Sequence, residues 1–203
     1  MLLKNHWDLI YKKKSSDQLS WTEDIPQTSL ELIDECRLSD KSAIIDVGGG
    51  ESKLVDFLIH LGYADITVLD ISEQSMARTK ERLEMKSEIV RWIVQDILEF
   101  ETDRLFDCWH DRAAFHFLTT PEWISKYAAL AKRYIKQNGY LIIGTFSKNG
   151  PKKCSGLSIK QYNAEEMFQV FSDGFKKVKC ITLDHETPFQ TKQNFLYCLF
   201  QRV

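Results

Sequence analysis

The sequence predicts an α/β fold, in which helices cover both faces of a mostly parallel sheet. Short apolar runs typical of buried strands alternate with stretches that have the apolar spacing of helices, which is the pattern of βαβ units. The last two strand-like runs are joined by a loop without a helix, so we expect them to pair as an antiparallel hairpin.

Each element follows from local pattern. Ser29 is a candidate N-cap for the first helix, and Thr120 before Pro121 is typical of a helix start. Asn138-Gly139 predicts a turn before a strand. The expected helices cover about residues 29–38, 51–61, 73–86, 121–136 and 164–171. The expected strands cover about residues 43–47, 66–69, 90–95, 105–109, 140–146, 175–184 and 194–202. We therefore expect a helical N-terminal extension at residues 1–40 and one domain at residues 41–203.

The composition is typical of a globular protein. The chain has 203 residues, of which 43% are hydrophobic, and this is enough for one domain with a sizeable core. A net charge of −2 and the lack of a long apolar stretch give no support for a nucleic-acid or membrane partner. Five dispersed cysteines without a C-x-x-C pair favour reduced thiols over a disulfide framework or structural zinc. We expect a cytoplasmic protein without a metal, as a monomer or weak dimer.

A run of glycines ends the first predicted strand and leads into a helix. Ligands of open α/β sheets bind beyond the carboxyl ends of the strands, where glycine allows a sharp turn and a close backbone approach. Lys53 stands where the dinucleotide fingerprint G-x-G-x-x-G has its third glycine, and Glu51 would repel a pyrophosphate. A ligand with one carboxylate and one ammonium fits better, and Asp46 could receive the ammonium. The glycines are Gly48, Gly49 and Gly50.

Acidic residues end the next two predicted strands. Asp70 lies 22 residues after Gly48, where a carboxylate can accept hydrogen bonds from both hydroxyls of a ribose. The alternative is a helix cap, a role that Ser72 could fill equally well. Asp96 could accept a hydrogen bond from an adenine amino group, and a plain helix cap is again the alternative.

These features, in this order and spacing, resemble class I S-adenosylmethionine-dependent methyltransferases. "KQNGYLIIGTF" also resembles the fifth-strand motif of that family, with Gln137-Asn138-Gly139 in place of the usual Pro-Gly-Gly. The resemblance covers about residues 40–203 and implies a Rossmann-like, seven-stranded sheet with S-adenosyl-L-methionine as the cofactor. The cofactor-binding residues that we assign are Trp21, Asp46, Gly48, Gly49, Gly50, Asp70, Ile71, Asp96 and Ile97.

The N-terminal sequence "HWDLIYKKKSSDQLSWTEDIPQTSLELI" resembles a narrower subgroup of small methyltransferases. The subgroup includes the citrate synthase lysine methyltransferase and small bacterial relatives, which share "DRAAFHFL" and a "GPxxCSGL" loop. The resemblance implies that the N-terminal segment folds over the cofactor and shapes the acceptor pocket. His6, Trp7, Tyr11 and Trp21 could offer aromatic faces to a sulfonium or an ammonium. Packing within an N-terminal helix is the alternative.

The segment after the fourth strand is where this fold places groups that contact the acceptor. Methyl transfer is an in-line displacement that needs mainly alignment, and it needs a base only if the nucleophile arrives protonated. His110 and Asp111 are candidates for a base or an orienting group, and Arg112 could bind an acceptor carboxylate. A polar network that supports the pocket wall is the alternative. We interpret the loop around Cys154 as a lid over the acceptor.

Three functions remain open from the sequence. The leading one is a methyltransferase that acts on a protein lysine or a small molecule. The others are a nicotinamide-dependent oxidoreductase and a catalytically silent S-adenosylmethionine-binding protein.

Overall fold

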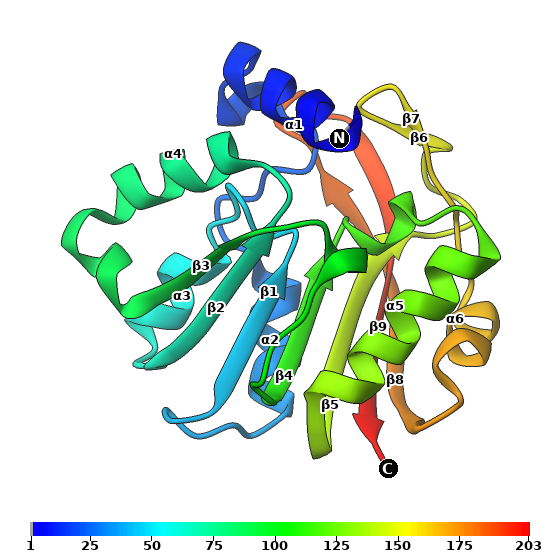
Figure 1. Cartoon of the computed structure of the whole chain (residues 1–203). Helices are drawn as coiled ribbons and strands as arrows, with labels where there is room; N and C mark the ends of the chain where they lie inside the picture. Colours follow the sequence, from blue (N-terminus) through cyan, green and yellow to red (C-terminus); the bar gives the residue numbers. More distant parts are fainter. Residues whose placement is uncertain (1) are drawn as a thin grey trace.

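The computed structural model describes residues 2–203, and its core is a seven-stranded sheet with the strand order β3-β2-β1-β4-β5-β9-β8 (Figure 1). The first five strands run parallel, and β9 lies antiparallel to both β5 and β8. This confirms the predicted α/β sheet with a C-terminal hairpin. The seven strands are β1 (Ala43–Val47), β2 (Asp65–Asp70), β3 (Val90–Val94), β4 (Phe106–Arg112), β5 (Ile135–Phe146), β8 (Phe175–Glu186) and β9 (Lys192–Arg202).

Helices cover both faces of the sheet, as predicted. Apolar side chains of α2 (Gln27–Glu35), α3 (Leu54–His60) and α4 (Glu73–Leu83) share one core with alternate strand residues. The other strand residues form a second core with α5 (Pro121–Tyr134) and α6 (Ala164–Phe171). Two cores arise because successive side chains of a strand point to opposite faces.

Two further elements lie outside these layers. Helix α1 (Leu2–Lys13), drawn in blue in Figure 1, crosses the edge of the sheet where the parallel strands end. A separate two-stranded hairpin consists of β6 (Lys153–Cys154) and β7 (Leu157–Ser158). Short 3-10 turns cover Ser16–Gln18, Glu84–Ile89, Ile97–Glu99 and Phe115–Phe117.

Two local predictions are wrong. Ser29 is not an N-cap, because α2 begins at Gln27 with Pro26 at its N-cap position, and Ser29 is buried inside the helix. Asn138-Gly139 is not a turn between elements, because β5 already begins at Ile135. Asn138 instead adopts a positive φ of 64° within the strand, beside a register shift between β4 and β5.

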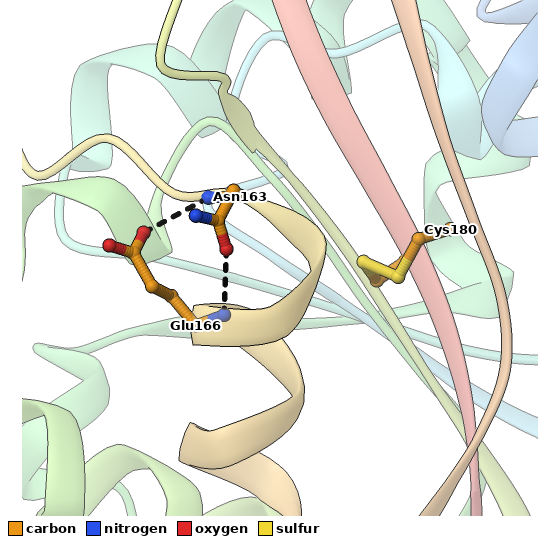
Figure 2. Close-up of a disulfide and its surroundings, with 4 residues drawn as sticks. Asn163, Glu166 and Cys180 are labelled. Carbon is orange, nitrogen blue, oxygen red and sulfur yellow. Dashed lines mark hydrogen bonds between the residues drawn. A yellow bond between two sulfur atoms is a disulfide. The ribbon is translucent and has the colours of Figure 1, made fainter.

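The prediction that all cysteines are reduced is also wrong, because the structure contains a Cys180–Cys198 disulfide (Figure 2). The two cysteines lie 18 residues apart, but they are direct partners in the antiparallel pairing of β8 with β9. Their proximity follows from the strand register, which sequence spacing does not reveal. The same view shows Asn163 and Glu166, whose reciprocal hydrogen bonds cap the start of α6.

Between Leu2 and Val203, no helix is both long and apolar enough to cross a lipid bilayer.

Candidate active site

A cavity, here called the main cavity, lies where β1, β2 and β3 end. Six of the predicted cofactor-binding residues line it: Trp21 from the N-terminal segment, and five that lie at or just after the ends of these three strands. Parallel strands deliver their carboxyl ends to one edge, so residues distant in sequence meet there. These five residues are Gly48, Asp70, Ile71, Asp96 and Ile97.

The glycine turn approaches its neighbours too closely for other residues. Gly48 has a φ of +70°, and a Cβ built on it would lie 2.5 Å from the Cβ of Ala114. A Cβ on Gly50 would lie 2.6 Å from Asp70 Oδ2. Both positions therefore require glycine, for conformation at Gly48 and for space at Gly50.

Asp70 is buried at the end of β2. Its Oδ1 accepts a hydrogen bond from the Ser72 backbone N–H at 2.7 Å, and its Oδ2 accepts one from Gly50 at 3.0 Å. Burial raises the pKa of the Asp70 carboxyl to about 6, although these backbone donors oppose the rise. Ser72 caps α4, since its Oγ accepts from the Ser75 N–H. The carboxylate of Asp70 therefore lines the cavity while another residue serves as the cap.

Asp96 caps a short turn and also lies beside the main cavity. Its Oδ1 accepts a hydrogen bond from the Leu98 N–H at 2.9 Å and so caps the short turn Ile97–Glu99. The residue also lines the main cavity.

Three aromatic rings of the N-terminal segment, here called the aromatic roof, line the main cavity: Trp7, Tyr11 and Trp21. The ring of Trp7 packs edge-on against those of Trp21 and Phe117, with centroids 5.8 and 5.1 Å away. Tyr11 packs against Trp21 at 6.4 Å, and all four rings line the cavity. His6 packs against Trp7 but is absent from the cavity lining formed by the described residues.

Polar contacts fix the N-terminal segment over the domain. Asp8 accepts a hydrogen bond from the Ser72 hydroxyl at 2.7 Å. Arg78 of α4 donates to the backbone oxygens of Tyr11 and Lys14 and pairs with Glu51. These contacts connect α1 and the glycine turn through α4.

Arg112 anchors the far end of this segment. Its guanidinium donates to the Trp21 carbonyl oxygen at 2.7 Å and to the Tyr197 hydroxyl at 2.8 Å, and it pairs with Glu23 at 3.0 Å. Arg112 lines the main cavity, and its Nη2, which faces Glu23, has no hydrogen-bond partner among residues 2–203.

Asp111 lies on the opposite face of the sheet from His110 and Arg112, the other two residues expected to contact the methyl acceptor. Its Oδ1 accepts from the Ala114 and Phe115 N–H groups, and its Oδ2 accepts from the Tyr127 hydroxyl at 2.7 Å. The side chain is fully buried and is absent from the cavity linings that the described residues form. Burial raises the pKa of Asp111 to about 6, with the Tyr127 hydrogen bond opposing the rise.

His110 and Asp46 line a second cavity, which adjoins the main one through Tyr11, Trp21, Gly48 and Arg112. The two side chains are hydrogen-bonded to each other, and His110 also contacts Ser29. Sequence reasoning missed Ser29 as a site residue. No local signal marks it, because only the packing of α2 against β4 brings it to His110.

Cys154 completes the wall of the main cavity from the β6–β7 hairpin. Burial raises the pKa of its thiol to about 11, so the sulfur carries its proton at neutral pH. Within residues 2–203, no group of three or more histidine, cysteine or acidic side chains is arranged to hold a metal ion.

Comparison with known proteins gives sequence similarity over part of the chain. Residues 44–139 match the family model described as a methyltransferase domain. The malonyl-[acyl-carrier protein] O-methyltransferase of Anoxybacillus flavithermus is 31% identical over 105 residues, which are 51% of this chain. The chain spans only 38% of that relative's length.

Solved structures are similar over nearly the whole chain. The N-methyltransferase NodS of Bradyrhizobium japonicum, in complex with S-adenosylhomocysteine, superimposes with a TM-score of 0.73 at 16% identity and 98% coverage of both chains. The 1,6-didemethyltoxoflavin-N1-methyltransferase of Burkholderia thailandensis gives a TM-score of 0.76 at 15% identity, over 100% of this chain and 88% of that one. A protein of echinomycin biosynthesis gives 0.79 at 18% identity, over 98% and 92%.

The strand order, the glycine turn and these similarities lead to one conclusion. The chain has the Rossmann-like fold of class I S-adenosylmethionine-dependent methyltransferases, and its residues 44–139 match the methyltransferase-domain family.

Proposed function

We propose that the protein is an S-adenosylmethionine-dependent methyltransferase. One observation carries the proposal: Gly48 of the glycine turn, Asp70 and Asp96 line a single cavity at the carboxyl ends of β1 to β3. Class I methyltransferases bind their cofactor at this position. Carboxylates there can accept hydrogen bonds from the ribose hydroxyls and the adenine amino group of a nucleoside.

The residues present fit this cofactor. Asp70 would accept the ribose hydroxyls, and Asp96 the adenine amino group, with the apolar side chains of Ile71 and Ile97 beside the base. The amino acid end would lie at the glycine turn, near Asp46. The cofactor supplies a methyl group that its sulfonium activates towards displacement. The chain's own role is then to hold donor and acceptor in line and to exclude water beneath the aromatic roof.

Acid–base catalysis has a small part in this proposal. The carboxylate of Asp111 accepts hydrogen bonds from three protein donors, and Arg112 donates to Trp21 and Tyr197 and pairs with Glu23. We therefore assign Asp111 and Arg112 to the support of the cavity wall, in place of the base and the carboxylate-binding group that the sequence predicts.

We further propose a small-molecule acceptor. The aromatic roof of Trp7, Tyr11 and Trp21 leaves a chamber with mostly apolar walls, and the matched O- and N-methyltransferases are named for their action on smaller compounds or a carrier-bound acyl group. A protein lysine, which the resemblance to the citrate synthase enzyme implies, is the competing acceptor.

A nicotinamide-dependent oxidoreductase is not supported, since the matched proteins are methyltransferases. A silent binding protein differs from an enzyme only in turnover, so binding and turnover need separate tests.

Thermal unfolding with S-adenosylmethionine, S-adenosylhomocysteine, NAD and NADP tests the cofactor. A ligand at ~100 times its dissociation constant adds about 2.7 kcal/mol to the free energy of unfolding. We expect stabilisation by the two adenosyl amino acids alone, and stabilisation by a dinucleotide alone would overturn the proposal.

Incubation of a cell extract with methyl-labelled cofactor tests the acceptor. Label in the small-molecule fraction supports our proposal, and label in protein supports the lysine alternative. Binding without any labelled product indicates the silent protein.

A further inference from the structure

Three buried side chains form a hydrogen-bonded chain behind the glycine turn. His110 Nδ1 lies 2.7 Å from Asp46 Oδ1, and His110 Nε2 lies 2.9 Å from Ser29 Oγ. The exposed fractions of Ser29, Asp46 and His110 are 1%, 2% and 2%. Asp46 and His110 are direct partners on the parallel strands β1 and β4, and Ser29 reaches them from α2.

The donors and acceptors of this chain can be assigned. An ionised Asp46 carboxylate only accepts hydrogen bonds, so His110 Nδ1 carries the hydrogen between them. In the neutral imidazole Nε2 is then an acceptor, and the Ser29 hydroxyl donates to it. Asp46 therefore fixes the tautomer of His110, Ser29 holds the other ring nitrogen, and the ring held in this way orients Asp46.

The second oxygen of Asp46 has no hydrogen-bond donor in the part of the chain that the structure describes. Among residues 2–203, Asp46 Oδ2 is buried without a hydrogen-bond partner. A Cβ built on Gly49 would lie 2.3 Å from this oxygen, so the oxygen faces the glycine turn. Both residues line the second cavity. A buried acceptor without a donor is costly, which points to a ligand group that donates to it.

We infer that Ser29 and His110 are positioning residues, which hold Asp46 so that its Oδ2 receives the ammonium of the cofactor's amino acid end. The inference rests on the proposed function. It gives α2, an element before the family-matched region, a part in cofactor binding.

The same three residue types form nucleophilic triads in hydrolases, but this chain lacks the required access. A nucleophilic serine must reach its substrate. Ser29 is 1% exposed and is absent from the described linings of the main and second cavities, so it acts through His110.

Two ligands that differ in the amino acid end give the test. S-adenosylhomocysteine carries the ammonium, and 5′-methylthioadenosine shares the adenosine but lacks the amino acid. Calorimetry would measure both dissociation constants for the wild type, Ser29→Ala and His110→Asn. We expect S-adenosylhomocysteine to bind roughly five- to tenfold more weakly to Ser29→Ala, the effect of one lost hydrogen bond, and at least as weakly to His110→Asn. Affinity for 5′-methylthioadenosine should change by less than about twofold.

Thr67→Val is the matched control, since it removes another buried hydroxyl from the same sheet, one without a hydrogen-bond partner in residues 2–203. Both affinities should stay at the wild-type values in this variant. Equal weakening of both ligands by Ser29→Ala and His110→Asn, or no weakening, would overturn the inference and leave the proposed function standing. A wild-type protein that binds neither ligand would overturn the proposed function and this inference with it.

Discussion

Two aspartates near the carboxyl ends of parallel strands share their chemistry but not their surroundings. Asp70 in β2 and Asp111 in β4 are both buried, and burial raises the pKa of each to about 6. Asp70 lines the main cavity, and its two oxygens each hold one backbone donor. Asp111 faces Tyr127, and three protein donors hold its carboxylate. Burial and a raised pKa are therefore common to both residues, and spare acceptor capacity beside a cavity distinguishes Asp70, the one that we propose as a binding group.

The largest expected effect comes from Asp111→Ala. The substitution leaves two backbone N–H groups and the Tyr127 hydroxyl without an acceptor, and each such buried group costs about 1–3 kcal/mol. We expect urea denaturation to show a loss of about 3 kcal/mol or more in the free energy of unfolding. Asp111→Asn keeps one acceptor oxygen and should lose less. If unfolding is unchanged while methyl transfer is abolished, Asp111 is a catalytic base after all.

The disulfide is a stabilising feature that lies far from Asp70. Four strands separate β2, which contains Asp70, from β8, which contains Cys180. Reduction should lower the free energy of unfolding by about 3 kcal/mol, the amount expected for a closed loop of this length. The affinity for S-adenosylhomocysteine should remain the same. Cys180→Ala is the control, since reductant should not alter its unfolding. A reductant effect on ligand affinity in the wild type would contradict the separation of the two regions.

Asp70→Asn should weaken ligand binding and leave the stability of the protein largely unchanged, which is the reverse of the effect expected for Asp111→Ala. Hydrogen bonds to a charged group contribute about 1.5–3 kcal/mol, so we expect affinity for S-adenosylhomocysteine to fall roughly tenfold to a hundredfold. Calorimetry measures this loss, and urea denaturation checks that the apo protein retains most of its stability. Wild-type affinity in this variant would exclude Asp70 from the site.

A smaller effect, the pH dependence of ligand affinity, tests whether the negative charge of Asp70 contributes to binding. Ribose hydroxyls donate to the ionised carboxylate, so binding favours the deprotonated form. Because the free protein has a pKa of about 6 at Asp70, affinity should be constant above pH 7 and fall as the pH decreases through 6. The limit is about tenfold per pH unit. The probe is 5′-methylthioadenosine, which lacks an ionisable amino acid end. Asp70→Asn should remove the pH dependence, and a persisting dependence would assign it to another group.

The position of Asp70 at the edge of the sheet can be predicted from the sequence. Strand ends, glycines and acidic residues are local features, and the parallel sheet brings their ends to one edge whatever the details of packing. The Asp111 side depends on which face of β4 each residue occupies. His110 and Asp111 are neighbours in sequence and therefore point to opposite faces. Only the packing of α2 and α5 reveals that His110 meets Ser29 and Asp111 meets Tyr127.

Two other predictions, reduced cysteines and an N-cap at Ser29, are also wrong. Cys180 and Cys198 become partners through the register of a hairpin, and a shift of one residue would separate them. Ser29 looks like a cap because it precedes an apolar helical pattern, yet α2 begins two residues earlier. The disulfide thus depends on a contact that is distant in the sequence, whereas the start of α2 at Pro26 and Gln27 is a local boundary that we predicted too late.

A crystal structure with S-adenosylhomocysteine would show whether the ligand binds at Asp70. We expect the ribose hydroxyls to lie about 2.5–2.8 Å from the Asp70 carboxylate, the range of hydrogen bonds from a hydroxyl to a charged oxygen. We also expect the adenine to contact Ile71 and Ile97 beneath the aromatic roof. A ligand bound elsewhere, or a ribose turned away from Asp70, would exclude the proposed cofactor site.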